Sequence, residues 1–240
     1  MIRSLSSAGA VGVIMLAAAS GSSAAPIDLT NPSSSASLAQ ILAQPGADAG
    51  KFIVFDKEFH VTTFAPTAGA PLAFTAAGIT ITGRDNGLDG VGFRMFGQWA
   101  DNPGDASAFG FTFEYDVSIL AAYAAQGYRI TGVNLAFNGA ASGLGSVASV
   151  DETVFDGQTL LGSARVFADG TSGTSDLSDM VPVTPRLTAN VIKDFKLFSP
   201  GSGGIATTSF IEQTFKQIVP APGTGAIAAF GLVALARRRR

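Results

Sequence analysis

The chain has 240 residues, among them one histidine and no cysteine. It therefore contains no thiolate nucleophile, no disulfide and no thiolate-bound metal, and it has too few histidines for a histidine metal cluster. Removing Arg3 and the four C-terminal arginines from the fifteen basic residues leaves ten, against eighteen acidic residues, so the remainder carries a net charge of about −8. This charge argues against nucleic acid as a partner, because counterion release needs clustered cations.

The N-terminal residues have the three parts of a secretory signal peptide. Arg3 is the positive region, residues 8–19 are apolar, and Ser22-Ser23-Ala24 is a small-residue cleavage site. We expect a signal peptide at 1–24 with cleavage between Ala24 and Ala25. A retained N-terminal anchor is the alternative.

Helical spacing occurs once before the pattern changes. Leu38, Ile41 and Leu42 recur at helix spacing behind Ser37 or Ser35, and Pro45-Gly46 ends the run. The sequence predicts one short helix there, and the alanines of 121–125 favour a further helical turn within 118–127.

Alternation with a period of two dominates the rest. In 109–117 the residues Phe109, Phe111, Phe113, Tyr115 and Val117 alternate with polar or small ones, which predicts a half-buried strand with its aromatic face inward. Further strands are expected at 52–55, 59–64, 79–82, 91–96, 128–137, 146–155, 164–167, 189–198 and 207–218. Glycine, asparagine and aspartate mark the turns between them. The pattern indicates an all-β domain at 25–218, an antiparallel two-sheet β-sandwich with a jelly-roll-like arrangement.

Two acidic, turn-rich segments are candidates for calcium. Their carboxylates belong to Asp85 and Asp89 and to Asp101 and Asp105. Calcium takes six to eight oxygen ligands, which loops of secreted sandwiches can supply. Ordinary Asx and glycine turns are the alternative. The segment with Asp176 and Asp179 is expected to be a solvated loop.

Aromatic residues suggest a surface for sugar rings. Trp99 with Phe96 and Tyr115 would form a platform beside the Asp101 loop, whereas the alternative places Trp99 in the core or at its rim.

Catalytic constellations are weak. His60 falls on the outer face of its strand, and no Gly-x-Ser-x-Gly elbow accompanies it. Glu114 and Asp116 share one strand face. They are either the paired carboxylates of a glycosidase or two ordinary solvated carboxylates. We predict no catalytic residue, no enzyme activity and no cofactor other than calcium.

The C-terminus has a three-part layout. Val219-Pro220-Ala221-Pro222 is followed by an apolar run at 226–236 and by Arg237, Arg238, Arg239 and Arg240. The run is shorter than the roughly 20 residues that cross a bilayer, and the arginines resist translocation. The layout resembles the PEP-CTERM sorting signal, with Pro-Ala-Pro in place of Pro-Glu-Pro. A hydrophobic helix with a basic end is the alternative.

The body of the chain resembles secreted PEP-CTERM proteins as well. The resemblance lies in 56–59, 136–140 and 209–215. It implies processing of a tag at 219–240 by an exosortase-like membrane protease, with transient insertion in the inner membrane, and it supplies no catalytic residues.

Three functions remain open at this stage. The first is a non-enzymatic cell-surface or extracellular-matrix protein associated with exopolysaccharide. The alternatives are a carbohydrate-binding module, with or without calcium, and a secreted polysaccharide hydrolase. Extracellular polysaccharide is the expected partner of the first two.

Overall fold

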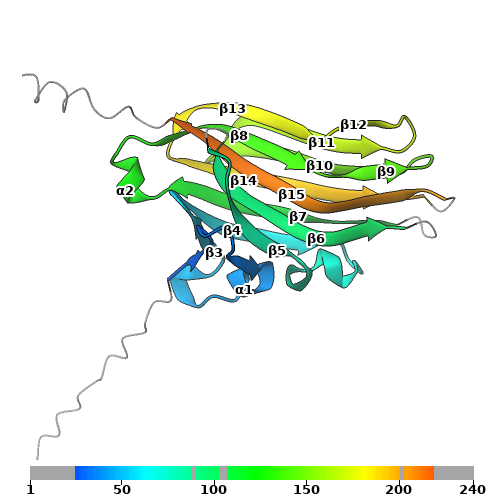
Figure 1. Cartoon of the computed structure of the whole chain (residues 1–240), viewed down its shortest axis with the longest axis horizontal. Helices are drawn as coiled ribbons and strands as arrows, with labels where there is room; N and C mark the ends of the chain where they lie inside the picture. The colour runs from blue at the N-terminus through cyan, green and yellow to red at the C-terminus, as the bar shows by residue number, and fades with distance from the viewer. Residues whose placement is uncertain (1–24, 88–89, 103–106, 201–202, 219–240) are drawn as a thin grey trace, which may run out of the picture.

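The computed structural model describes residues 25–87, 90–102, 107–200 and 203–218. Two β-sheets lie face to face along the long axis of the molecule (Figure 1). The expected signal segment 1–24 and sorting segment 219–240 lie outside the described residues. Among the residues that are described, no helix has the length and apolarity needed to cross a membrane.

Both sheets are built mainly from antiparallel strands, although the short pair β1 and β3 is parallel. Sheet A has the order β1 (Ile27–Asp28), β3 (Lys51–Val54), β4 (Lys57–Pro66), β7 (Ala108–Ile119), β14 (Thr188–Phe198), β10 (Val147–Asp156), β11 (Thr159–Asp169) and β12 (Thr174–Asp176). Sheet B has the order β13 (Ser178–Arg186), β8 (Arg129–Phe137), β15 (Ile205–Ile218), β6 (Val91–Asp101), β5 (Thr80–Asp85) and β2 (Ser35–Ser37), and β9 (Ala140–Ser142) pairs with β15. The predicted all-β, two-sheet sandwich is confirmed.

Strand β7 shows why the sandwich forms. Phe111, Phe113, Tyr115 and Val117 are buried, while the intervening residues of the strand point away from the core. Phe109 is half-buried and packs at the rim. A shift of one residue in register would expose this whole aromatic set, so the hydrophobic pattern fixes the pairing with β4 and β14.

Helix α1 (Leu38–Leu42) forms where the spacing predicts it. The Ser37 hydroxyl accepts a hydrogen bond from the Gln40 amide at 3.1 Å, and the Gln40 side chain accepts one from the Ser37 amide, which completes a capping box. A second short helix, α2 (Ala121–Ala124), lies within 118–127, as the alanine run suggests.

The structure corrects the expectation of a solvated loop around Asp176 and Asp179. Asp176 ends β12, and Asp179 lies in β13, where its carboxylate accepts a hydrogen bond of 2.9 Å from the Arg165 amide. β13 contains Pro182 and Pro185, which weaken a strand signal in the sequence but are tolerated at the edge of a sheet. The short strands β1, β2 and β9 were also missed.

Candidate functional site

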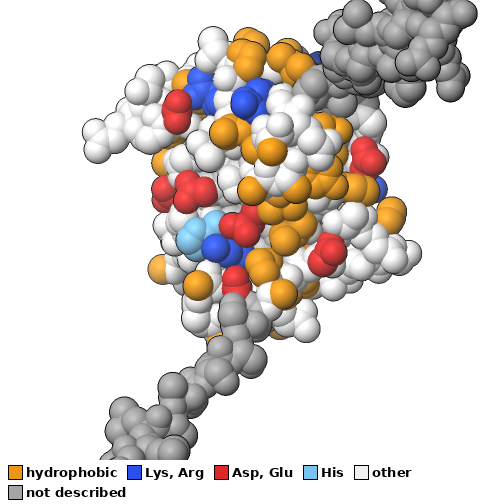
Figure 2. Space-filling view, turned by 90° about the vertical axis from the view of Figure 1, so that its left-hand side faces the viewer, with side chains coloured by type: hydrophobic (Ala, Val, Ile, Leu, Met, Phe, Trp, Pro, Cys, Tyr) orange, Lys and Arg blue, Asp and Glu red, His pale blue; other side chains and the backbone are white. Residues whose placement is uncertain are grey.

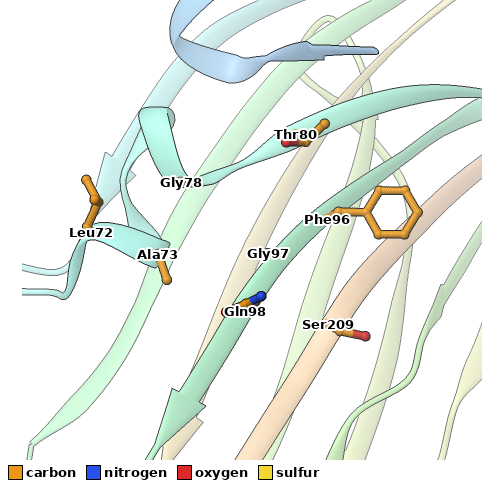
Figure 3. Close-up of a pocket in the computed structure, with 8 residues that line it drawn as sticks. All are labelled: Leu72, Ala73, Gly78, Thr80, Phe96, Gly97, Gln98 and Ser209. Carbon is orange, nitrogen blue, oxygen red and sulfur yellow. The ribbon is translucent and has the colours of Figure 1, made fainter. Parts of the chain in front are cut away.

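A shallow groove of about 560 Å³ lies on the outer face of sheet B. One wall is the pair of 3₁₀ helices η2 (Leu72–Phe74) and η3 (Ala76–Gly78), which connect β4 to β5. The floor and the other wall come from β6 and β15 (Figure 3). The lining residues are Leu72, Ala73, Gly78, Thr80, Phe96, Gly97, Gln98 and Ser209.

The floor of the groove is a β-bulge. Two residues of β6, Gly97 and Gln98, lie opposite the single residue Ser209 of β15. A Cβ atom at Gly97 would lie 2.2 Å from the indole ring of Trp99, so only glycine fits above that ring. Bulges redirect side chains locally, and here the bulge places the exposed Gln98 amide in the groove.

The η2 wall is anchored in the core. The Trp99 indole nitrogen donates a hydrogen bond of 2.7 Å to the carbonyl oxygen of Ala73. The neighbouring Phe74 ring is 1% exposed and stacks on Phe195 with ring centres 6.1 Å apart. These contacts leave Leu72 at the rim, 71% exposed.

The opposite wall combines aromatic rings with fixed charges. Phe96 and Phe210 pair across β6 and β15, and the Arg94 guanidinium lies 5.6 Å and 4.1 Å from their ring centres. Arg94 is held by an ion pair with Glu212. This arrangement fixes the orientation of the Phe96 ring at the edge of the groove.

Asn138 holds the β15 side of the bulge. Its side-chain oxygen accepts hydrogen bonds from the Thr208 hydroxyl at 2.8 Å and from the Ser209 and Phe210 amides at 3.0 and 2.9 Å. Its side-chain nitrogen donates to the Ser209 hydroxyl at 2.7 Å. The Ser209 hydroxyl is therefore positioned by a fixed network.

The groove offers the groups that bind a sugar. A half-buried aromatic ring and the exposed Leu72 can pack against the C–H faces of a pyranose, and an amide and two hydroxyls can pair with its hydroxyl groups. The hydroxyls are those of Thr80 and Ser209. The lining contains no charged side chain, which suits a neutral ligand.

The aromatic platform expected around Trp99 is wrong in two of its three members. Trp99 is 1% exposed and Tyr115 is fully buried, so neither can stack on a ligand, and the core alternative holds for both. Phe96 alone reaches the surface. The sequence reasoning missed Thr80, Gln98 and Ser209; the available signal was Gly97, because a glycine inside a strand pattern often marks a bulge.

The calcium candidates are only partly described. Asp85 is exposed and accepts a hydrogen bond of 2.9 Å from the Gly87 amide, as in an Asx turn. Asp101 is 2% exposed and accepts one of 2.7 Å from the Ser199 amide. Asp89 and Asp105 lie outside the described residues. The described part of the chain contains no group of three potential metal ligands, and the calcium hypothesis stays a prediction.

His60, Glu114 and Asp116 all lie on the outer face of sheet A, as the alternation predicts. His60 pairs with Asp116 in register and neighbours the Lys51–Glu58 ion pair, whose atoms are 3.4 Å apart. Figure 2 shows the histidine among acidic and basic side chains at one end of the sandwich. The Asp116 carboxylate accepts a hydrogen bond of 3.1 Å from the side-chain nitrogen of Asn190.

No family model matches the chain, and no curated protein matches it in sequence. Solved structures with some likeness include TmCBM61 in complex with β-1,4-galactotriose, at 7% identity over 64% of this chain and 87% of that one, with a TM-score of 0.29. Another is CsCBM6-3 from Clostridium stercorarium in complex with cellobiose, at 13% identity over 64% and 92%, with a TM-score of 0.22. A third is the family 12 xyloglucanase of Bacillus licheniformis, at 9% identity over 69% and 96%, with a TM-score of 0.25. Similarity this low assigns no function to the chain.

Proposed function

We propose that this protein is an exported, non-enzymatic β-sandwich that binds an extracellular polysaccharide in the groove between η2, η3, β6 and β15. The observation that carries the proposal is the set of lining groups. An aromatic ring, an exposed amide and two hydroxyls surround a glycine floor, and no charge is among them. This is the combination that neutral sugar rings require.

The side chains that line the groove are held in place before a ligand binds. Arg94 and Glu212 fix Phe96 on one side, and Trp99 fixes η2 on the other. Fixing these groups before binding lowers the conformational entropy that a ligand would otherwise have to overcome.

The export and sorting signals belong to the same proposal. A signal peptide and a PEP-CTERM-like tag would deliver the domain to the cell surface, and polysaccharide binding would then retain it in the matrix. The negative charge of the 25–218 segment suits a protein that does not adhere to anionic surfaces. The jelly-roll-like arrangement is also part of the proposal, and it is supported by successive strands such as β13, β14 and β15 that alternate between the sheets.

Binding to a panel of neutral polysaccharides, including exopolysaccharide from the native host, tests the proposal. Phe96→Ala and Gln98→Ala should each weaken binding roughly tenfold, which corresponds to about 1.4 kcal/mol. Circular dichroism should show that both variants stay folded.

Phe167→Ala is the matched control. Phe167 is also a half-buried phenylalanine on an outer face, and Arg165 lies 5.7 Å from its ring centre, but it belongs to sheet A. This variant should bind as the wild type does. Equal losses in Phe96→Ala and Phe167→Ala, or a wild type that retains none of the polysaccharides, would contradict the proposal.

A further inference from the structure

A lysine, a glutamate and a glutamine meet in the core between the sheets. Lys193 of β14, Glu152 of β10 and Gln213 of β15 are 0%, 1% and 0% exposed. Lys193 and Glu152 pair directly in sheet A, whereas Gln213 reaches them from sheet B. The contact therefore joins the two layers of the sandwich.

The three side chains are in direct contact. The Lys193 amine contacts both the Glu152 carboxylate and the side-chain carbonyl oxygen of Gln213. The Gln213 side-chain nitrogen donates a hydrogen bond of 2.9 Å to the Asn134 carbonyl oxygen, which holds the amide in place. The amine thus lies beside the carbonyl group of a fixed carboxamide.

Two polar atoms in this region lack a partner among the described residues. They are Oε1 of Glu152 and the hydroxyl of Tyr115, both buried. Unpaired buried polar groups are costly, so the unpaired Glu152 oxygen, on the carboxylate that the lysine contacts, calls for an explanation beyond packing. Both atoms therefore have hydrogen-bonding capacity that no described residue uses.

The surroundings favour the uncharged amine, which is the nucleophilic form. Burial lowers the pKa of Lys193, and the charge of Glu152 offsets this in part. Burial and the same carboxylate raise the pKa of Tyr115. The Tyr115 ring packs against Phe93 and Phe113, with ring centres 5.3 Å away in each case, so water is excluded.

We propose that Lys193 and Gln213 form an intramolecular isopeptide bond, with Glu152 as the proton carrier. Transfer of a proton within the Lys193–Glu152 ion pair gives a neutral amine and a neutral carboxylic acid. The amine nitrogen attacks Cδ of Gln213, the Nζ–Cδ bond forms and the Cδ–Nε2 bond breaks. Glu152 gives its proton to the departing nitrogen and takes one from Nζ, so ammonia leaves and Glu152 returns to its acid form.

The bond would join strands of opposite sheets, as a disulfide does in other secreted domains. The chain has no cysteine with which to make such a link. A covalent tie between β14 and β15 restricts the unfolded chain and stabilises the sandwich in the same way. The inference is independent of the groove and of the polysaccharide proposal.

The chain contains a second trio for comparison. Lys57 is fully buried and contacts Asp56, at 2.9 Å, and the side-chain oxygen of Gln217. Gln217 is only half-buried and lies near the end of β15, whereas Gln213 is fully buried. We assign no bond to this trio, and it serves as a control for the chemistry.

Peptide mass spectrometry of the full-length chain tests the bond. Trypsin should release a branched peptide in which 187–196 is joined to 197–216, with two N-termini at Leu187 and Leu197 and the mass of one ammonia molecule missing. The branched peptide is needed because succinimide formation at Asn86-Gly87 or Asn138-Gly139 also releases ammonia. Fragment spectra distinguish it from a linear 187–216 peptide, which has one N-terminus.

Three variants distinguish a covalent bond between Lys193 and Gln213 from a non-covalent contact between them. Glu152→Gln and Gln213→Leu should abolish the branched peptide, and Lys57→Met should keep it. The proposal would be overturned if the folded wild type yielded only the unlinked peptides 187–193 and 197–216. This outcome decides the question whether or not the variants fold. A branched peptide that persists in Glu152→Gln would also overturn the proposal.

Discussion

The indole nitrogen of Trp99 lies 2.7 Å from the carbonyl oxygen of Ala73 and donates a hydrogen bond to it. This contact ties the core of the sandwich to a surface wall, because Ala73 belongs to η2 and lines the groove. Trp99, which the sequence suggested as part of a surface platform for sugar rings, therefore supports the groove from the core side.

Trp99→Phe should loosen this wall. Losing the hydrogen bond and part of the ring is expected to lower the free energy of unfolding by about 1–3 kcal/mol in chemical denaturation. Hydrogen exchange should quicken at the amide of Phe74 in η2 and at that of its C-cap Thr75, which donate to the carbonyl oxygens of Pro71 and Leu72. Unchanged exchange at these two amides would show that the indole does not hold η2.

Gly97→Ala should be destabilising, because its new Cβ atom would meet the Trp99 ring at 2.2 Å. We expect a loss of about 1–3 kcal/mol in the free energy of unfolding, as for other overpacked sites. Gly132→Ala is the matched control: it lies in a strand of the same sheet, and its Cβ atom would meet nothing closer than 3.4 Å. Equal thermal stability of the two variants would contradict the role of Gly97 as the floor.

Glu212→Gln should destabilise the charged side of the groove. Glu212 is 13% exposed; besides its ion pair with Arg94, it lies 3.3 Å from Arg84. Removing its charge leaves two guanidinium groups without a counter-charge, so we expect a loss of about 1–2 kcal/mol that shrinks in high salt.

The comparison for Glu212 is Asp151→Asn. Asp151 pairs with Arg165 at 3.3 Å, but both side chains are more than half exposed. Such a pair contributes about 0–0.5 kcal/mol, so denaturation midpoints should hardly move. If both substitutions have the same small effect, partial burial does not strengthen the Glu212 pair.

Tyr115→Phe should change the response to alkali. Because the pKa of Tyr115 is raised in the folded state, the unfolded chain loses this proton first, and rising pH above 10.0 favours unfolding of the wild type. The variant has no phenol to ionise, so it does not lose this stability. The free energy of unfolding of the variant should therefore rise relative to that of the wild type as the pH increases above 10.0. A difference that stays constant from pH 7 to 11 would argue against a buried, protonated phenol.

Processing at the C-terminus is predicted from sequence alone. The protein isolated from its native host should begin near Ala25 and end close to Val219-Pro220-Ala221-Pro222, without the terminal arginines. The arginines resist passage through the membrane, so the tag pauses where a membrane protease can act. An intact mass that still includes Arg237 to Arg240 would rule out sorting by an exosortase and favour a plain membrane anchor.

Local pattern was enough to predict the class of fold. The alternation in β7 and the capped spacing of α1 are signals carried by neighbouring residues, and both elements formed as expected. β13 was missed because its two prolines obscure the alternation, and its place at the edge of sheet B is a property of the assembled sheet. The candidate site was largely missed for a related reason. Thr80, Gln98 and Ser209 lie on three different strands, and the pairing of β5, β6 and β15 in sheet B, with its bulge, brings them together.

The sequence by itself determined which face of a strand such as β7 is buried, because alternation in a strand leaves one buried face wherever the sheets pack. It also carried the net charge, the absence of cysteine and the layout of the two terminal segments. The tertiary structure alone decided that Trp99 supports a groove instead of lining it. It alone brought Gln213 of sheet B against Lys193 and Glu152 of sheet A, because contacts between sheets depend on how two separate layers are stacked, which no local pattern encodes.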